Sequence, residues 1–517
     1  MQGSSFSTKV DFDDTKLAYG SKSTLELVRS YAVFQLCSVP IIVRNANNLY
    51  TFSKKVFPPP LVDGIIKRTF FAHFCGGETT SDLRPCISML DSAGVSGILD
   101  YAAENAPDEV EEEKGCESDE SEGGQPARVY DYVGEKECDH HVQVFKQCIT
   151  AVKDVTPRGF AALKLTALGN PILLERLSTA IVETRKLFEQ FDRNGDGVVS
   201  REEFEEAYKD IFVDAEEKLP EILRRLDPEG TGEVDYVEWS KLLQPTDLPR
   251  LVAGCREEGP LSKATPTPEE LELMTAMKSR LWEIANLSKD LSVRLLIDAE
   301  QTYYQPAIDN YVLELQKEFN SKSRTENADV PIIFNTYQCY LKDSQDRVKL
   351  DLLRATRSNY HFAAKLVRGA YMLAERERAE KLGYASPIND TIEDTHNMYN
   401  DTVSMLMEDR KVNNTKNEVM IASHNRTSVE SAIKKVEELG IDNKSGAIHF
   451  AQLLGMRDDL SFSLGCAGFN AYKYVPYGKV KEVMPYLIRR AQENSDITKG
   501  MGDELKGLGG ELKRRFF

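Results

Sequence analysis

Several side chains that could do chemistry stand at or near the ends of short β-rich segments. They are Lys164, Asp298, Glu300, Gln338, Lys365, Arg368 and His424. A single lysine or histidine in such a place is more often a satisfied structural group, but the set together predicts a site. Arg489 and Arg490 are adjacent near the end of a later helical run. Because arginine binds carboxylate oxygens bidentately, this pair and Lys164 predict a carboxylate clamp, with a surface basic turn as the alternative.

Two stretches in the middle of the chain have the pattern of EF-hand calcium loops. Such loops need alternating oxygen ligands, a glycine at the sharp turn and a bidentate carboxylate at the twelfth place. The ligand positions hold Asp192, Asn194, Asp196, the Val198 carbonyl, Ser200 and Glu203 in the first loop, and Asp227, Glu229, Thr231, the Glu233 carbonyl, Asp235 and Glu238 in the second. Helical runs flank both loops, and Val199 and Val234 are placed to pair as a short ladder, so the tandem predicts a calcium unit. For the second loop, where Glu229 and Thr231 are weaker ligands than aspartate, an acidic helix pair without metal stays open.

Composition narrows the function classes. The chain has 517 residues, a formal net charge of −18 and 41% hydrophobic residues, enough for a large core. This charge argues against a nucleic-acid surface, which needs a clustered positive face. The nine cysteines lack paired spacing, so we expect free thiols, and we interpret Cys138, His140 and His141 as a helix start rather than a metal site. The longest apolar stretch, 31–43, is too short to span a membrane.

Eight short β-rich segments alternate with amphipathic helices. They cover residues 94–101, 159–168, 292–301, 330–338, 362–371, 418–425, 446–455 and 471–478. This alternation predicts an α/β fold with a distorted (β/α)8 barrel, in which catalytic groups gather at the carboxyl ends of the strands. An open doubly wound sheet is the rival, but no GxGxxG phosphate loop follows an early segment.

The same pattern predicts how the chain is divided. We expect an N-terminal helical region over 1–93 and the first part of the barrel over 94–182, with a disordered acidic loop at 104–127. An inserted all-α EF-hand pair over 183–245 is followed by the rest of the barrel over 246–500 and a tail over 501–517. The first residues show neither a signal-peptide core nor an arginine-rich transit pattern, so we expect any targeting segment to be missing from this chain.

Several motifs together resemble the mitochondrial proline dehydrogenase family. They are "FAALKLTALG", "LIDAEQTYYQPAID", "FNTYQCYLKD", "KLVRGAY", "IASHN", "FAQLLGM", "KYVPYG" and "YLIRRAQENS", in family order from about Val10 to the C-terminus. The resemblance implies FAD-dependent oxidation of L-proline to 1-pyrroline-5-carboxylate, with electrons passed to ubiquinone. It also implies a matrix-side location with peripheral contact to the mitochondrial inner membrane.

The resemblance further implies roles for particular residues. Lys164, Arg489 and Arg490 would hold the substrate carboxylate beneath a capping last helix, and Asp298, Tyr371, Tyr474 and Tyr486 would line the substrate pocket. FAD would contact Ala299, Gln338, Arg368, Gly369, Ala370, Ser423 and His424. Asp298 and Lys365 are the expected catalytic residues, with Lys365 near the reactive flavin nitrogen. Hydroxyproline-specific relatives carry a smaller residue at the position of Tyr474, so the resemblance implies a preference for proline.

Three other functions remain open. Lys164 could be a Schiff-base lysine, which would make the chain an aldolase-like enzyme without flavin. The barrel could be inactive and serve as a calcium-dependent binding module. A sister flavoenzyme acting on hydroxyproline is the nearest alternative. A visible spectrum before and after addition of proline would separate these functions.

Overall fold

The computed structural model describes residues 10–102, 132–195, 198–227, 230–240, 245, 247–256, 259–323, 330–443, 445–496 and 498–517. The acidic run 104–127 lies outside these ranges, as do the predicted metal ligands Asp196 and Glu229.

Eight parallel strands close into a barrel. They are β1 (Val95–Tyr101), β2 (Phe160–Leu163), β5 (Arg294–Ile297), β6 (Ile333–Gln338), β7 (Ala363–Val367), β8 (Glu418–Ala422), β9 (Ile448–Leu453) and β10 (Asn470–Tyr477). Each strand pairs with the next in chain order, and β10 closes the ring on β1. The predicted barrel is confirmed, and all eight segments form strands. Seven of them are shorter than predicted, and β10 is shifted by one residue. The largest differences are at β2, which ends at Leu163 because η3 (Leu165–Leu168) is a 3-10 turn, and at β5, which ends at Ile297.

Alternate residues of these strands fill the inside of the barrel. One buried cluster joins Phe160 and Ala162 of β2 to residues of the seven other barrel strands, including Leu296, Ala363 and Met420. Successive side chains of a strand point to opposite faces, so the residues two places further along point the same way. This period brings charged and polar side chains to the carboxyl end of the barrel interior.

A ring of helices covers the barrel. It comprises α8 (Glu135–Val155), α9 (Pro171–Phe191), α15 (Pro268–Leu291), α16 (Gln305–Phe319), α17 (Ser344–Arg357), α18 (Met372–Leu382), α19 (Ile392–Val412), α20 (Arg426–Leu439) and α21 (Asp458–Cys466). Capping boxes fix the start of α15 through Thr267 and Glu270 and the start of α19 through Thr391 and Asp394. Such caps satisfy helix N–H groups that have no partner within the helix.

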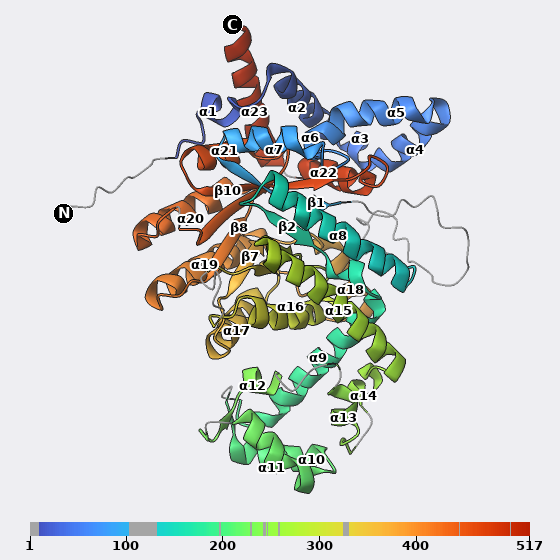
Figure 1. The fold of residues 1–517 in the computed structure, drawn as a ribbon, viewed down its shortest axis with the longest axis vertical. Coiled ribbons are helices and arrows are strands. Elements are labelled where there is room, and N and C mark those ends of the chain that lie inside the picture. Colours follow the sequence, from blue (N-terminus) through green and yellow to red (C-terminus); the bar gives the residue numbers. More distant parts are fainter. Residues whose placement is uncertain are drawn as a thin grey trace, which may run out of the picture.

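The two ends of the chain build one helical layer over the barrel, at the top of Figure 1. The N-terminal part contains α1 (Thr15–Tyr19), α2 (Thr24–Cys37), α3 (Pro40–Arg44), α4 (Ala46–Val56), α5 (Pro59–Ile66), the π-helix η1 (Lys67–Phe71), α6 (Ala72–Phe74) and α7 (Leu83–Ser92). The C-terminal part contains α22 (Met484–Asp496) and α23 (Thr498–Phe516). Residues of α1, α2, α22 and α23 share one buried cluster. The segment expected as a tail is therefore an ordered helix, which packs through leucines at helical spacing such as Leu505, Leu508 and Leu512.

The inserted unit lies at the opposite end of the molecule (Figure 1). It holds β3 (Val199–Ser200), α10 (Arg201–Ile211), α11 (Ala215–Leu226), β4 (Glu233–Val234), α12 (Tyr236–Ser240), α13 (Leu248–Val252) and α14 (Pro260–Ala264). Val199 pairs with Val234 in an antiparallel ladder, as the sequence predicted. The unit is thus helical apart from this ladder, and α9 runs unbroken from the barrel into it, across the expected boundary at 183. It has its own hydrophobic cluster, in which Phe191, Phe204 and Trp239 are fully buried.

Other predictions from composition also have a structural outcome. Cys138, His140 and His141 lie in α8, and the described residues contain no cluster of three or more His, Cys, Asp or Glu that could hold a metal ion. The eight cysteines in the described ranges are free thiols. Within the same ranges, no helix combines the length and apolarity needed to cross a bilayer.

Candidate active site

The centre of the candidate site is an ion pair between the ends of two strands that flank β6 in the barrel. Lys365 of β7 and Asp298, directly after β5, are both buried and pair through Nζ and Oδ1. The other carboxylate oxygen of Asp298 accepts a hydrogen bond of 2.9 Å from the Tyr474 hydroxyl on β10. The Lys365 ammonium lies 5.7 Å from the centre of the Tyr474 ring. One carboxylate therefore fixes a lysine and a phenol that come from β7 and β10, which are separated by two other strands of the barrel.

Two further charged groups lie beside this centre. Lys164, directly after β2, is buried. Burial alone would raise the pKa of the Asp298 carboxyl, but the charges of Lys365 and Lys164 outweigh it and hold that pKa below its usual range. Glu300 accepts hydrogen bonds from the Thr166 amide at 3.2 Å and hydroxyl at 2.6 Å, and burial raises its pKa.

Arg368, just after β7, anchors a second polar cluster. Its guanidinium donates to the Ser423 hydroxyl at 2.5 Å, to the Ser428 hydroxyl at 2.8 Å and to His396 Nδ1 at 3.2 Å. It also stacks 4.5 Å from the centre of the Tyr399 ring. A cation and two hydroxyls thus gather where the β8–α20 loop leaves the barrel.

Gln338, the last residue of β6, joins this region to the β5 end. Its amide donates to the Glu300 carbonyl at 2.8 Å, and its side-chain oxygen accepts from the Ala370 amide at 3.4 Å. Gly369 has a φ of +138°, and a Cβ there would come within 2.4 Å of the Tyr340 ring. Only glycine fits this close approach without strain. Tyr371 follows at the start of α18, and Ala299, between Asp298 and Glu300, is partly exposed.

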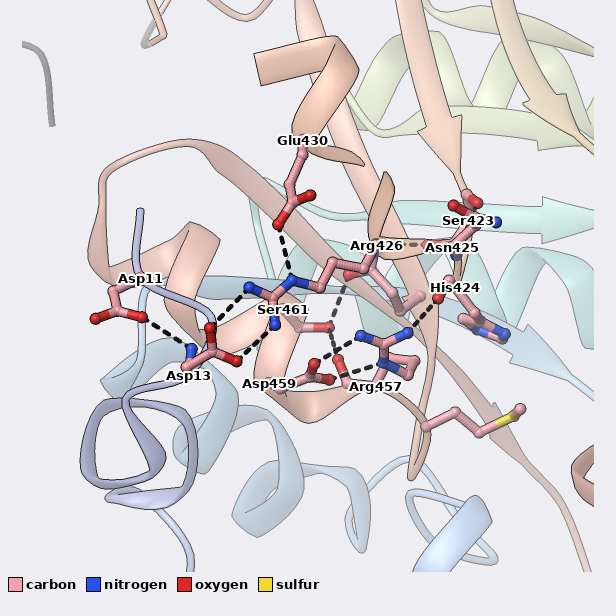
Figure 2. A network of polar contacts seen from close by, with 12 residues as sticks. Asp11, Asp13, Ser423, His424, Asn425, Arg426, Glu430, Arg457, Asp459 and Ser461 are labelled. Atoms are coloured by element: carbon pink, nitrogen blue, oxygen red, sulfur yellow. Dashed lines mark hydrogen bonds and ion pairs between the residues drawn. The ribbon is translucent and has the colours of Figure 1, made fainter. Parts of the chain in front are cut away.

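His424 follows Ser423 at the end of β8. Its Nε2 accepts a hydrogen bond of 3.0 Å from the Leu453 amide, so the ring has a fixed orientation. Burial lowers the pKa of His424 to about 3, with nearby arginines including Arg490 acting in the same direction. Figure 2 shows Arg457, which forms a bidentate pair with Asp459 and donates to the His424 carbonyl at 2.7 Å.

The N-terminal segment is tied to the same loop. Figure 2 shows Asp13 facing Arg426, the first residue of α20, and the two side chains form two hydrogen bonds of 2.6 and 2.9 Å. Arg426 also donates to Glu430 one turn later in α20, at 2.7 Å. These contacts hold the loop that carries Ser423 and His424.

Helix α22 brings the predicted arginine pair to the barrel mouth. Tyr486 and Arg489 are buried, and the Arg490 guanidinium lies 5.0 Å from the centre of the Tyr486 ring. Because Arg490 contributes to the low pKa of His424, its charge lies close to the end of β8. A basic turn on the open surface is therefore not what the structure shows.

The second candidate site is the pair of loops in the inserted unit. In the first, Asp192 accepts from the Gly195 amide at 2.8 Å, and Glu203 accepts from the Ser200 amide and hydroxyl at 3.0 and 2.8 Å. In the second, Asp227 accepts from the Thr231 and Gly232 amides at 2.7 and 2.8 Å.

A barrel residue enters the second loop. Arg357, the last residue of α17, forms an ion pair with Asp235, and its Nη1 lies 3.8 Å from Glu238 Oε1. Two predicted calcium ligands thus face a guanidinium. A cation bound there would have to compete with Arg357.

Comparisons with known proteins identify the family of this chain. The profile of the family described as "Proline dehydrogenase" matches residues 133–502. The chain is 38% identical over 546 residues to human "Proline dehydrogenase 1, mitochondrial", covering 98% of this chain and 90% of the relative. The chain belongs to the proline dehydrogenase family. It is also 36% identical over 558 residues to the Drosophila melanogaster protein of the same name, covering 98% and 81% of the two chains. A Xenopus laevis "Hydroxyproline dehydrogenase" is 29% identical over 496 residues, covering 96% and 88%.

A solved structure of proline utilization A from Bdellovibrio bacteriovorus shares the fold of this proline dehydrogenase family member. The TM-score is 0.54 at 16% identity, and the match covers 93% of this chain and 38% of that one. The chain therefore spans well under half of that longer protein, and the likeness shows the fold alone.

Some residues of the polar clusters in this proline dehydrogenase family member were not predicted from the sequence as site residues. Ser428 and His396 lie on helices rather than at strand ends, and Arg457 precedes α21, so the alternation of the strands gave no signal for them. Glu300 was recognised as a strand-end group without a role. Its position two residues after Asp298 is the signal that places both carboxylates on one strand end.

Proposed function

We propose that this chain oxidises L-proline to 1-pyrroline-5-carboxylate with FAD as its cofactor. The observation that carries the proposal is the group of buried Lys365, Asp298 and Lys164 with the partly buried Tyr474 at the barrel mouth of a proline dehydrogenase family member. The aldolase alternative is weaker, because the chain belongs to the proline dehydrogenase family and the charge of Lys164 acts on the Asp298 carboxylate beside it.

The donor set fits a flavin dinucleotide. A guanidinium with two hydroxyls, from Arg368, Ser423 and Ser428, suits an anionic pyrophosphate, and the Gln338 amide and His424 suit the polar edges of a ring system. We assign cofactor contacts to these residues and to the backbone at Ala299, Gly369 and Ala370. When bound, FAD would supply the hydride acceptor, and the protein would supply orientation and electrostatics.

The chain's own residues would bind and orient the substrate. Lys164, Arg489 and Arg490 would hold the carboxylate, and Tyr371, Tyr474 and Tyr486 would enclose the ring. Positioning of this kind supplies much of the rate gain, because the reacting atoms are held at near-attack distance. The lowered pKa of Asp298 makes it a poor base, so we assign it to holding Lys365 and Tyr474 in place. The substrate amine must be neutral at the moment of oxidation, and two nearby ammonium groups disfavour its protonated form.

The remaining parts of the proposal concern partners and place. We assign ubiquinone as the electron acceptor and the matrix side of the mitochondrial inner membrane as the location, consistent with the mitochondrial names of the relatives. We also propose that the inserted unit binds Ca²⁺, with the first loop as the stronger site, because Arg357 occupies the acidic groups of the second.

A visible absorption spectrum tests the central claim. The purified protein should show flavin bands that bleach when proline is added without oxygen. A colourless protein that cannot be reconstituted with FAD would contradict the proposal, as would flavin that proline leaves oxidised. Bleaching by trans-4-hydroxyproline but not by proline would favour the hydroxyproline alternative. If neither substrate reacts while Ca²⁺ binds, the chain is a calcium-dependent binding module on an inactive barrel.

A further inference from the structure

An apolar groove opens in the helical layer beside the candidate site. It has a volume of about 380 Å³ and is lined by residues of α2, α3, α4, α5, η1 and α22. In Figure 1 its outer wall, α4 and α5, projects to one side of the molecule, away from the barrel. The groove is built from the ends of the chain and is separate from the barrel interior.

The groove and its rim expose large apolar side chains to an unusual degree. Ile41 is 71% exposed and Phe52 64%, and the turn between α4 and α5 adds Val56, Phe57 and Leu61, each more than half exposed. Contiguous exposed apolar surface of this kind marks an interaction site rather than ordinary surface. On α4, Leu49, Phe52 and Val56 recur at helical spacing and form one apolar stripe, which a helix lying in a membrane interface requires.

The charge of this region is opposite to that of the whole chain. Residues 38–77 contain five basic residues and one acidic residue, a formal charge of +4, whereas the whole chain carries −18, which leaves −22 for the rest. Arg44, Lys55 and Arg68 are exposed around the groove. Lys54 lies on the Tyr50 ring and pairs with Asp63 at 3.3 Å, and Lys67 pairs with Glu78. An apolar face with a basic rim complements an anionic lipid surface.

We propose that this face, made by α3, α4, α5 and the groove behind them, docks onto an anionic lipid bilayer. The turn at Phe57 and the stripe of α4 enter the headgroup region, and Arg44, Lys55 and Arg68 contact lipid phosphates. The docking adds a membrane surface to the proposed function. Its link to quinone reduction rests on that proposed function. That link is α22, whose Met484, Leu487, Ile488 and Ala491 line the groove while Tyr486, Arg489 and Arg490 belong to the candidate substrate site. Docking therefore brings a lipid-soluble acceptor to the helix that covers the barrel mouth.

Vesicle flotation with the full chain tests the surface. Wild type should float with vesicles of phosphatidylcholine and phosphatidylglycerol in equal parts, and much less with phosphatidylcholine alone. Phe52→Asp combined with Phe57→Asp should reduce flotation about tenfold or more, since charged groups are costly in the apolar layer. A triple change, Arg44→Glu, Lys55→Glu and Arg68→Glu, should remove the preference for the anionic vesicles.

A matched control lies on the opposite side of the barrel. Ile392 and Val412, at the two ends of α19, are 70% and 78% exposed, so Ile392→Asp with Val412→Asp adds the same charges elsewhere. This control should float like wild type, and thermal melting should show that every variant is folded.

Two results would overturn the proposal. The first is flotation of the Phe52 and Phe57 variant at the wild-type level. The second is a wild type that does not bind vesicles and forms a dimer in solution, together with a Phe52 and Phe57 variant that is monomeric. Turnover of proline with a water-soluble dye separates this inference from the proposed function. The Phe52 and Phe57 variant and the triple variant should keep turnover with the dye but lose turnover with a quinone dissolved in the vesicles. If wild type shows no turnover with the dye, the proposed oxidation is contradicted, and the flotation result still stands by itself.

Discussion

At the scale of single residues, the candidate site combines two opposite uses of charge. Asp298 neutralises Lys365 within the barrel, whereas the Arg490 guanidinium lies 5.0 Å from the centre of the Tyr486 ring, which orients it without cancelling its charge. The first arrangement fixes the geometry of the strand ends, and the second holds a positive charge on the helix over the barrel mouth.

Replacement of Arg489 or Arg490 by lysine should raise the KM for proline about tenfold or more. The planar fork is replaced by a point charge, which keeps the sign and loses the bidentate geometry. Steady-state kinetics with a dye acceptor measures this change, and flavin absorbance per protein should stay constant. An unchanged KM in both variants would remove them from the clamp.

Tyr474→Ser should narrow the ratio of kcat/KM between proline and trans-4-hydroxyproline while lowering turnover of proline. The smaller side chain makes room for a ring hydroxyl, and the hydrogen bond of 2.9 Å to Asp298 is lost or lengthened. Tyr474→Phe is the matched control, because it removes the hydroxyl and keeps the ring. Its substrate ratio should stay close to that of wild type. If Tyr474→Ser leaves the ratio untouched, Tyr474 does not set specificity.

At the scale of elements, the strand period made most of the barrel predictable. Lys164, Asp298, Gln338, Lys365, His424 and Tyr474 each continue an inward-facing series, such as Ala363 and Lys365 on β7. The sequence pattern was sufficient to predict these positions, because each barrel strand pairs with the strands that come before and after it in the barrel. It was insufficient for Ser428, which depends on where α20 begins, and for the pairing of Arg357 with Asp235, which joins residues 122 positions apart. It also missed α23, whose glycines hide the helical spacing of its leucines.

Buried histidines on two elements should make the protein acid-sensitive. Burial lowers the pKa of His73 on α6 to about 3, the same direction as for His424. Because the unfolded chain binds these protons near pH 6.5 and the folded chain does not, stability is lost as the pH falls from about 6.5 toward 3. Each histidine adds up to about 1.4 kcal/mol of loss per pH unit in that window.

His73→Asn should therefore flatten the pH dependence of unfolding. The loss of unfolding free energy between about pH 6 and pH 5 should shrink by about 1 kcal/mol. Denaturant titrations at both pH values measure this difference, and exposed His140→Asn on α8 is the control. Equal slopes for wild type and His73→Asn would show that His73 is not buried as a neutral ring.

At the scale of the whole molecule, the three hydrophobic clusters outside the barrel interior that contain the most residues belong to different parts of the protein. One surrounds the barrel, one joins the two chain ends over its mouth, and one belongs to the inserted unit alone. The chain-end layer carries α22, so the candidate substrate site is covered by a part of the protein that assembles only when both ends are present.

Calcium should raise the Tm by a few degrees, because a ligand that binds only the folded state stabilises it by about 2.7 kcal/mol at one hundred times its Kd. Glu203→Ala together with Glu238→Ala should abolish the rise. Arg357→Gln should strengthen binding to the second loop, since a competing cation is removed. Titration calorimetry measures both effects, and absence of any heat of calcium binding to wild type would end the calcium proposal.

The inserted unit leaves the barrel through α9 and returns through α14, and these two helices pack against each other. Because the two ends of the inserted segment lie together, a short linker should be able to join them without moving the barrel strands. Replacement of residues 187–258 by a short glycine–serine linker should then give a protein that still oxidises proline. Calcium should not change the Tm of this protein. This result would make the unit a separable calcium-binding module, and it would place everything needed for the proposed oxidation in the barrel and the chain-end layer.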